Sequence, residues 1–68
     1  MSIDDFIKRS VKLYLEGGHV LKGKVYDKTW IRSTSSNGNL LKKEALVLEV
    51  NGHTTLVIFD KVVAYEIY

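Results

Sequence analysis

The 68-residue sequence contains no cysteine and no proline, and the missing cysteine limits how so short a chain can be stabilised. It excludes a disulfide and a cysteine-based metal site, and His19 and His53 have no companions at metal-ligand spacing. A single domain of this size buries only about 60% of the surface that its unfolded chain exposes. Domains this small usually need a cross-link, a metal or a partner. We therefore expect a homo-oligomer, the alternative being an independent monomer with a well-packed core.

Long apolar runs and catalytic motifs are also missing. No segment approaches the roughly 20 apolar residues of a membrane span, and the N-terminal residues are too polar for a signal peptide. A cytoplasmic, reducing compartment and no membrane partner are expected. The chain has no cysteine nucleophile, no phosphate-binding glycine loop and no recognisable Ser-His-Asp pattern. The prediction is a protein without catalytic activity, metal or cofactor.

The net charge is small but unevenly distributed. The chain carries a formal charge of +2, and residues 1–44 contain nine Lys or Arg against five Asp or Glu. Residues 45–68 contain Lys61 against Glu49, Asp60 and Glu66. This asymmetry leaves room for an anionic partner on one face, although an ordinary solvated surface would also accommodate it.

The N-terminal residues are typical of a short helix over about residues 3–9. Ser2 can cap it, and Asp4 and Asp5 suit the positive end of the helix dipole. Lys8 and Arg9 suit its negative end. The apolar residues fall on one side at helical spacing, which predicts that this side packs against the rest of the chain.

The next segment is typical of a hairpin. Apolar residues alternate with polar ones from Val11 to Leu15, which predicts a half-buried strand. Gly17 and Gly18 supply the positive φ angles of a tight turn. Gly23 lies on the inward face of the return strand, where a missing Cβ lets the strand bend sharply. The pattern predicts the first hairpin of a small, strongly curved barrel.

Two further hairpins follow. Residues 28–44 are polar and contain "SNGN", a turn signal, so we expect an extended hairpin arm or ordered loop, with flexibility as the competing interpretation. Asn51-Gly52 joins two strands, and Asp60-Lys61 separates the second of them from a last strand. One short helix and five strands predict a mainly β chain, most economically a small SH3-like barrel.

Two groups of residues resemble the Sm-like family, which includes bacterial Hfq. Gly18, Leu21 and Gly23 match the spacing of its first motif, and "FDKVVAY" (residues 59–65) is similar to its second. The resemblance covers roughly residues 1–27 and 45–68. It implies a five-stranded, strongly bent barrel that assembles into a homo-oligomeric ring and binds single-stranded RNA. The compact, divergent form suits a phage-borne member.

The chain also departs from this family. The stretch between the motifs is longer than in Hfq. Thr29 and Ser33 stand where Sm-like proteins often carry an acidic residue and an asparagine in the nucleotide pocket. Asp60 and Lys61 replace the lysine and histidine of the Hfq turn, and an acidic residue there would repel phosphate. The alternative function is therefore an Sm-like or SH3-like barrel that serves as a protein-interaction or assembly module.

The candidate RNA-binding residues come from three places. Trp30 could stack on a base with Arg32 and Ser33 beside it, or could instead plug the barrel end or a subunit interface. The resemblance places Phe59 and Lys61 near the pore of a ring, with core packing as the alternative for Phe59. Lys8 and Arg9 could lie on a ring face, although the helix dipole alone would explain them. The candidate set is Trp30, Arg32, Ser33, Phe59, Lys61, Lys8 and Arg9.

Overall fold

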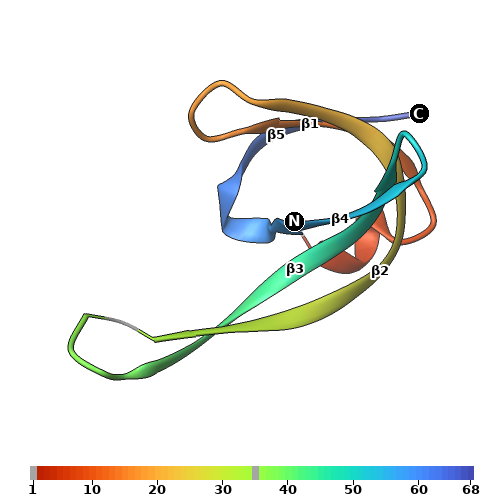
Figure 1. The fold of residues 1–68 in the computed structure, drawn as a ribbon. Helices are drawn as coiled ribbons and strands as arrows, with labels where there is room; N and C mark the ends of the chain where they lie inside the picture. The colour runs from red at the N-terminus through yellow and green to blue at the C-terminus, as the bar shows by residue number, and fades with distance from the viewer. Residues whose placement is uncertain (1, 35) are drawn as a thin grey trace.

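A computed structural model describes residues 2–34 and 36–68, which form one sheet of five antiparallel strands (Figure 1). The elements in chain order are the 3₁₀ helix η1 (Ile3–Phe6), β1 (Ser10–Leu15), β2 (Val20–Thr34), β3 (Leu40–Val50), β4 (His53–Ile58), the 3₁₀ helix η2 (Phe59–Lys61) and β5 (Val62–Ile67). The spatial order is β4-β3-β2-β1-β5, which leaves β4 and β5 as edge strands of an open sheet. The prediction of a mainly β chain with five strands is confirmed.

The predicted helix over residues 3–9 is wrong in length, because η1 contains only residues 3–6. Its start is as expected from the sequence. The Ser2 hydroxyl accepts a hydrogen bond from the Asp4 N–H at 3.3 Å, and the Ser2 N–H donates to the Asp5 carboxylate at 3.3 Å. Together these two bonds form a capping box, which satisfies N–H groups that a helix start leaves unpaired.

The helix ends early because the chain pairs with β2 instead. Ile7 is extended, and Lys8 has a positive φ of 64°. The Lys8 N–H donates to the Val25 carbonyl at 2.8 Å, and the Val25 N–H donates to the Arg9 carbonyl at 2.9 Å. Lys8 and Arg9 therefore lie in a turn that crosses from η1 to β1, the crossing segment, and neither caps the end of a helix.

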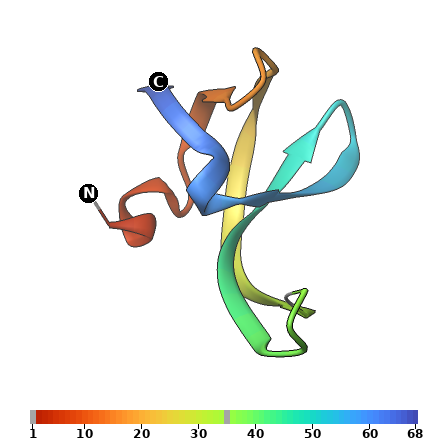
Figure 2. The same cartoon turned by 90° about the vertical axis from the view of Figure 1, so that its left-hand side faces the viewer.

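Two features bend β2 between its pairing with β1 and its pairing with β3. A Cβ built on Gly23 would lie 2.3 Å from the Glu49 carbonyl oxygen, so the β3 backbone occupies the space of a side chain. Two residues later the β2–β3 register shifts between Val25 and Asp27, which marks a bulge. Bulges increase local twist and bend a strand. As a result the sheet curves around one apolar face, as two perpendicular views show (Figures 1 and 2).

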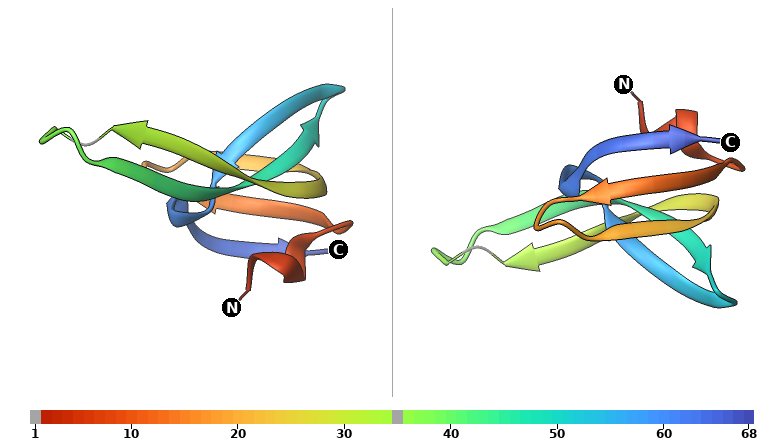
Figure 3. Two further views of the ribbon diagram at one scale, coloured as in Figure 1. Left: turned by 90° about the horizontal axis from the view of Figure 1, so that it is seen from below. Right: turned by 90° about the horizontal axis from the view of Figure 1, so that it is seen from above.

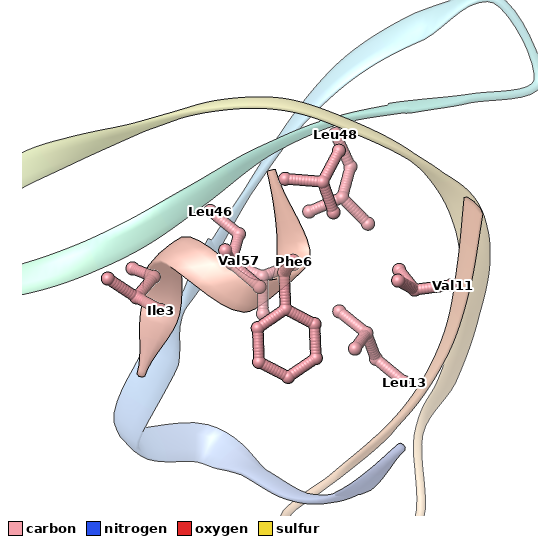
Figure 4. Close-up of a cluster of buried hydrophobic side chains, with 8 residues drawn as sticks. Ile3, Phe6, Val11, Leu13, Leu46, Leu48 and Val57 are labelled. Carbon is pink, nitrogen blue, oxygen red and sulfur yellow. The ribbon is translucent and has the colours of Figure 1, made fainter. Parts of the chain in front are cut away.

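The core lies on the concave face of the curved sheet, and η1 covers it (Figure 4). Phe6 is fully buried at its centre and meets the rings of Phe59 and Tyr65 edge-on, with centroids 5.6 and 4.8 Å away. Edge-to-face contacts of this kind stabilise aromatic pairs beyond their buried area. The other core members come from η1 and four strands: Ile3, Val11, Leu13, Val25, Leu46, Leu48 and Val57.

The distal parts of β2 and β3 form a two-stranded arm. From Trp30 opposite Glu44 outward to Thr34 opposite Leu40, the described strands pair only with each other. Gly38, with a φ of +83°, lies in the connection between them. We use "the arm" for residues 28–44 and "the body" for the rest. Views from below and above show the arm extending beyond the body on one side (Figure 3).

Candidate nucleic-acid interface

Within residues 2–34 and 36–68 the fold encloses no pocket and contains no cluster of three or more His, Asp or Glu side chains suited to a metal ion. None of the helices in this part of the chain has the length and apolar character needed to cross a bilayer. The candidate site is therefore an open surface, and its chemistry depends on which charged and aromatic side chains the strands bring together.

One face of the arm carries the exposed tryptophan. Side chains alternate along a strand, so Lys28, Trp30 and Arg32 share a face of β2. Their neighbours on β3 include Glu44, opposite Trp30, and Lys42, opposite Arg32. The Trp30 side chain is 62% exposed, which excludes it from the core and from any plug of the body within one subunit. We call this set the Trp30 face.

The arm also carries the net positive charge of the molecule. It contains Lys28, Arg32, Lys42 and Lys43 against Glu44, a net +3, so the body has a net charge of −1. The Lys28 ammonium lies 2.6 Å from the Asp4 carboxylate, and the hydrogen bond to Asp4 raises the pKa of Lys28.

Two of these cations form no ion pair within the part of the chain that the structure describes. Among the described residues neither Arg32 nor Lys42 forms an ion pair, although they lie directly opposite each other. The Trp30 face therefore combines an exposed ring with two free positive charges. Ser33, the next candidate, lies in β2 opposite Leu41 in register.

The closing turn is different, because its charges are matched. The Lys61 ammonium lies 3.4 Å from the Glu16 carboxylate, and the Lys61 carbonyl accepts the Glu16 N–H at 2.8 Å. Asp60 lies 3.8 Å from the Lys43 ammonium of its own chain. Phe59 is half-buried and packs against the core through Phe6. The turn thus presents little net charge around an aromatic ring that faces inward.

The structure groups the candidates into three separate sets. Trp30 and Arg32 lie together on the arm, and Phe59 and Lys61 belong to η2. Lys8 and Arg9 are exposed in the crossing segment between η1 and β1, and within the described chain they form no ion pair. Lys42 was not in the candidate set, although residues 41–43 could be expected from the sequence to extend a phosphate track or to form a solvated face. Its opposition to Arg32 became visible only once the register was known.

A lysine–tyrosine surface on the outer face of β1, β2 and β5 was also missed from the sequence. Three lysine ammonium groups lie over tyrosine rings at 4.9–5.6 Å from the ring centroids, in the pairs Lys12–Tyr14, Lys22–Tyr68 and Lys24–Tyr26. The signal was a Lys or Tyr at every second position, at residues 12 and 14 of β1 and at residues 22, 24 and 26 of β2. Cation–π contacts at exposed sites are weakly favourable.

Glutamates complete this surface from within the same chain. The Tyr14 hydroxyl donates to Glu66 and the Tyr26 hydroxyl to Glu49, each at 2.9 Å. The hydrogen bond to Glu49 raises the pKa of Tyr26. Because these cations, rings and carboxylates satisfy one another, the lysine–tyrosine surface offers a ligand fewer free groups than the Trp30 face.

Comparisons with models of protein families, with curated proteins and with solved structures find no match for this chain. Chemically, the arrangement can bind an anionic, partly aromatic ligand by stacking and charge. It also exposes two strand edges that can pair with another strand.

Proposed function

We propose that this chain is an Sm-like protein that assembles into a homo-oligomeric ring and binds single-stranded RNA without chemical conversion. The observation that carries the proposal is the sheet order, which leaves β4 and β5 as the two free edges. An exposed strand edge is a template for pairing with another chain. Pairing β4 of one subunit with β5 of the next satisfies every edge only when the assembly closes on itself.

The side chains at both edges support this assembly. Leu56 on β4 is 53% exposed and Val63 on β5 is 68% exposed. On β5, Tyr65 and Ile67 share the core-facing side with Leu13 and Val11 of β1, yet both remain substantially exposed. An incompletely covered edge of the core is the feature that a neighbouring subunit would cover.

A single-stranded nucleic acid is the ligand that the exposed chemistry favours. Proteins hold single strands with aromatic faces and cationic groups that follow the backbone, and each stacked base contributes about 1–3 kcal/mol. A ring repeats each subunit's cations around one axis and attracts a phosphate chain more strongly than the charge of +2 per subunit would. Lys61 would add to this field, but Glu16 beside it reduces its effect.

The assembly-module alternative also has an observation in its favour. Leu40 and Leu41 are adjacent in the arm and both are exposed, at 61% and 42%. Side chains on adjacent residues of a strand point to opposite faces. Apolar groups on both faces of a projecting hairpin suit contact with another protein.

Two measurements test the proposal. Light scattering of the purified chain at micromolar concentration should give the mass of a closed assembly of several subunits. Fluorescence anisotropy with labelled A/U-rich and mixed-sequence single-stranded RNA should show binding that weakens as salt rises, with a log–log slope of about −0.7 per phosphate contact. A monomeric mass would contradict the ring. Absence of RNA binding at low salt from an assembled protein would favour the assembly module.

A further inference from the structure

We infer that the Trp30 face of the arm is the binding site for single-stranded nucleic acid, and that it accepts RNA and DNA alike. This inference rests on the proposed nucleic-acid binding and assigns it to the arm rather than to the closing turn. Three features of the arm carry the inference: the charge distribution, one cross-strand pair, and the chemistry of the groups that surround Trp30.

The charge distribution directs an anion to the arm. The arm has a net charge of +3 and the body −1. In the body, Lys61 is matched by Glu16, while the lysines of the outer face lie over tyrosine rings. Asp4 and Asp60 of the body balance Lys28 and Lys43, so the arm attracts a polyanion through Arg32 and Lys42, which form no ion pair in the described chain.

The cross-strand pair of Arg32 and Lys42 marks a place for a phosphate. Like charges directly opposite each other on paired strands destabilise the pairing. These two face each other with no carboxylate bound to either in the described chain. A phosphate between them would replace this repulsion with two charge-assisted contacts, which are stronger than hydrogen bonds between neutral groups.

Trp30 adds a stacking surface beside this cation pair. It precedes Arg32 by two residues on the same face, which along a strand is about 6.6 Å. Its exposed ring can stack on an unpaired base but not on the bases of a duplex, which are already stacked. The geometry therefore favours a single strand over a double helix.

Of the groups around Trp30, the two cations and the indole do not distinguish the two sugars, and the carboxylate of Glu44, opposite Trp30, repels the phosphates of RNA and DNA alike. Ammonium and guanidinium groups pair with phosphates, and indole stacks on any base. A protein tells RNA from DNA through contacts with the 2′-hydroxyl. Binding through Arg32, Lys42 and Trp30 uses groups that both nucleic acids share.

The single tryptophan makes the test direct. The full-length protein would be titrated with unlabelled U-rich RNA and T-rich DNA of equal length while Trp30 emission is followed. Anisotropy of the same oligonucleotides, labelled, would report binding anywhere on the protein. We expect both strands to bind and both to quench Trp30 over the same concentration range.

Variants separate the stacking and charge contributions. Trp30→Ala should weaken binding of both strands about 5- to 150-fold with little change in the salt slope, because stacking releases no counterions. Arg32→Ala with Lys42→Ala should reduce the slope by about 1.4, or about 0.7 for each lost phosphate contact. The matched control is Lys22→Ala with Lys24→Ala, which removes two charges from the body and should leave Trp30 quenching intact.

The outcomes distinguish this inference from the proposed function. Binding that leaves Trp30 emission unchanged, or that survives both arm variants, would overturn the arm as the site and leave RNA binding standing. Binding of RNA but not of DNA would overturn the shared recognition. A smaller assembly mass for Trp30→Ala would show that another subunit covers this face and would also overturn the inference. Failure of the wild-type protein to bind any strand would overturn the proposed function itself.

Discussion

At the scale of single residues, position 23 requires glycine because the backbone of the neighbouring strand lies close to it, and not because of an unusual dihedral angle. Its φ is not positive, unlike those of Gly17 and Gly18. The carbonyl of Glu49 and the side chain of Val50 occupy the position where a Cβ would lie. The strand can therefore bend there because β3 approaches closely, which only the absence of a side chain permits.

Gly23→Ala should consequently destabilise the fold strongly. The new methyl group would lie 2.3 Å from a backbone oxygen that cannot rotate away, so β2 and β3 must separate. Overpacking typically costs about 1–3 kcal/mol, and we expect a loss at or above the upper end of that range by urea unfolding. Gly18→Ala is the control, because its Cβ meets nothing within 4 Å and only its φ of +87° is strained. A smaller loss for Gly23→Ala than for Gly18→Ala would contradict this account.

Tyr26 should ionise at a higher pH than an ordinary tyrosine. Its hydroxyl donates to Glu49, and the hydrogen bond raises the pKa of Tyr26 above 10.0. Because the folded pKa is the higher one, its contribution to stability is complete below pH 10 and is lost as pH rises through the folded value. Subtracting the phenolate absorbance titration of Tyr26→Phe from that of the wild type isolates the titration of the Tyr26 hydroxyl. Glu49→Gln should return the midpoint of the Tyr26 titration toward 10.0. An unchanged midpoint would contradict the role of Glu49.

At the scale of elements, the arm combines regular strand pairing with little burial. Its strands are hydrogen-bonded to each other beyond Trp30, and most of its side chains are exposed. A two-stranded hairpin alone is only marginally stable in water. Two ion pairs, Lys28 with Asp4 and Lys43 with Asp60, join the inner end of the arm to the body.

The amide protons of the arm should therefore exchange before those of the body. Local opening requires little free energy where few apolar contacts are lost. Native-state hydrogen exchange followed by mass spectrometry should show residues 30–34 and 40–44 exchanging faster than β1 and the inner part of β3. If the arm amides were among the slowest, the arm would be part of the stable core, contrary to its exposure.

Turn chemistry made much of this arrangement predictable. Gly17-Gly18 and Asn51-Gly52 adopt the positive φ angles that their hairpins require, and the five strands follow from the alternation between these turns. The end of η1 was not predictable, because residues 7–9 fit a helix locally and pair with Val25 only through tertiary structure. The bulge after Val25 has no turn residue to signal it. The opposition of Arg32 and Lys42 was not visible either, because it depends on the register in which the strands leave and re-enter the connection between Thr34 and Leu40.

At the scale of the whole molecule, the two edge strands should control assembly. Val63→Lys together with Leu56→Lys places a charge on each exposed edge, a device that natural sheets use to prevent edge pairing. We expect the mass measured by light scattering to fall toward that of one subunit, with the β-rich circular dichroism spectrum retained. Leu40→Lys is the matched control on the arm and should leave the mass unchanged. An unaltered assembly in the double variant would show that the edges are not the interface.

The separation of charge between arm and body also gives the molecule an electric dipole. Arg32 and Lys42, which form no ion pair in the described chain, lie on the arm of a particle about 40 Å long, whereas Asp4 and Asp60 balance Lys28 and Lys43 at its inner end. This uneven distribution produces a torque in the field of a polyanion. Such a torque turns the protein during its approach, so that the arm faces the polyanion at contact and a larger share of encounters leads to binding. Orientation before contact affects the association rate more than the lifetime of the complex. Added salt should therefore lower the association rate constant for a single-stranded nucleic acid more than it raises the dissociation rate constant.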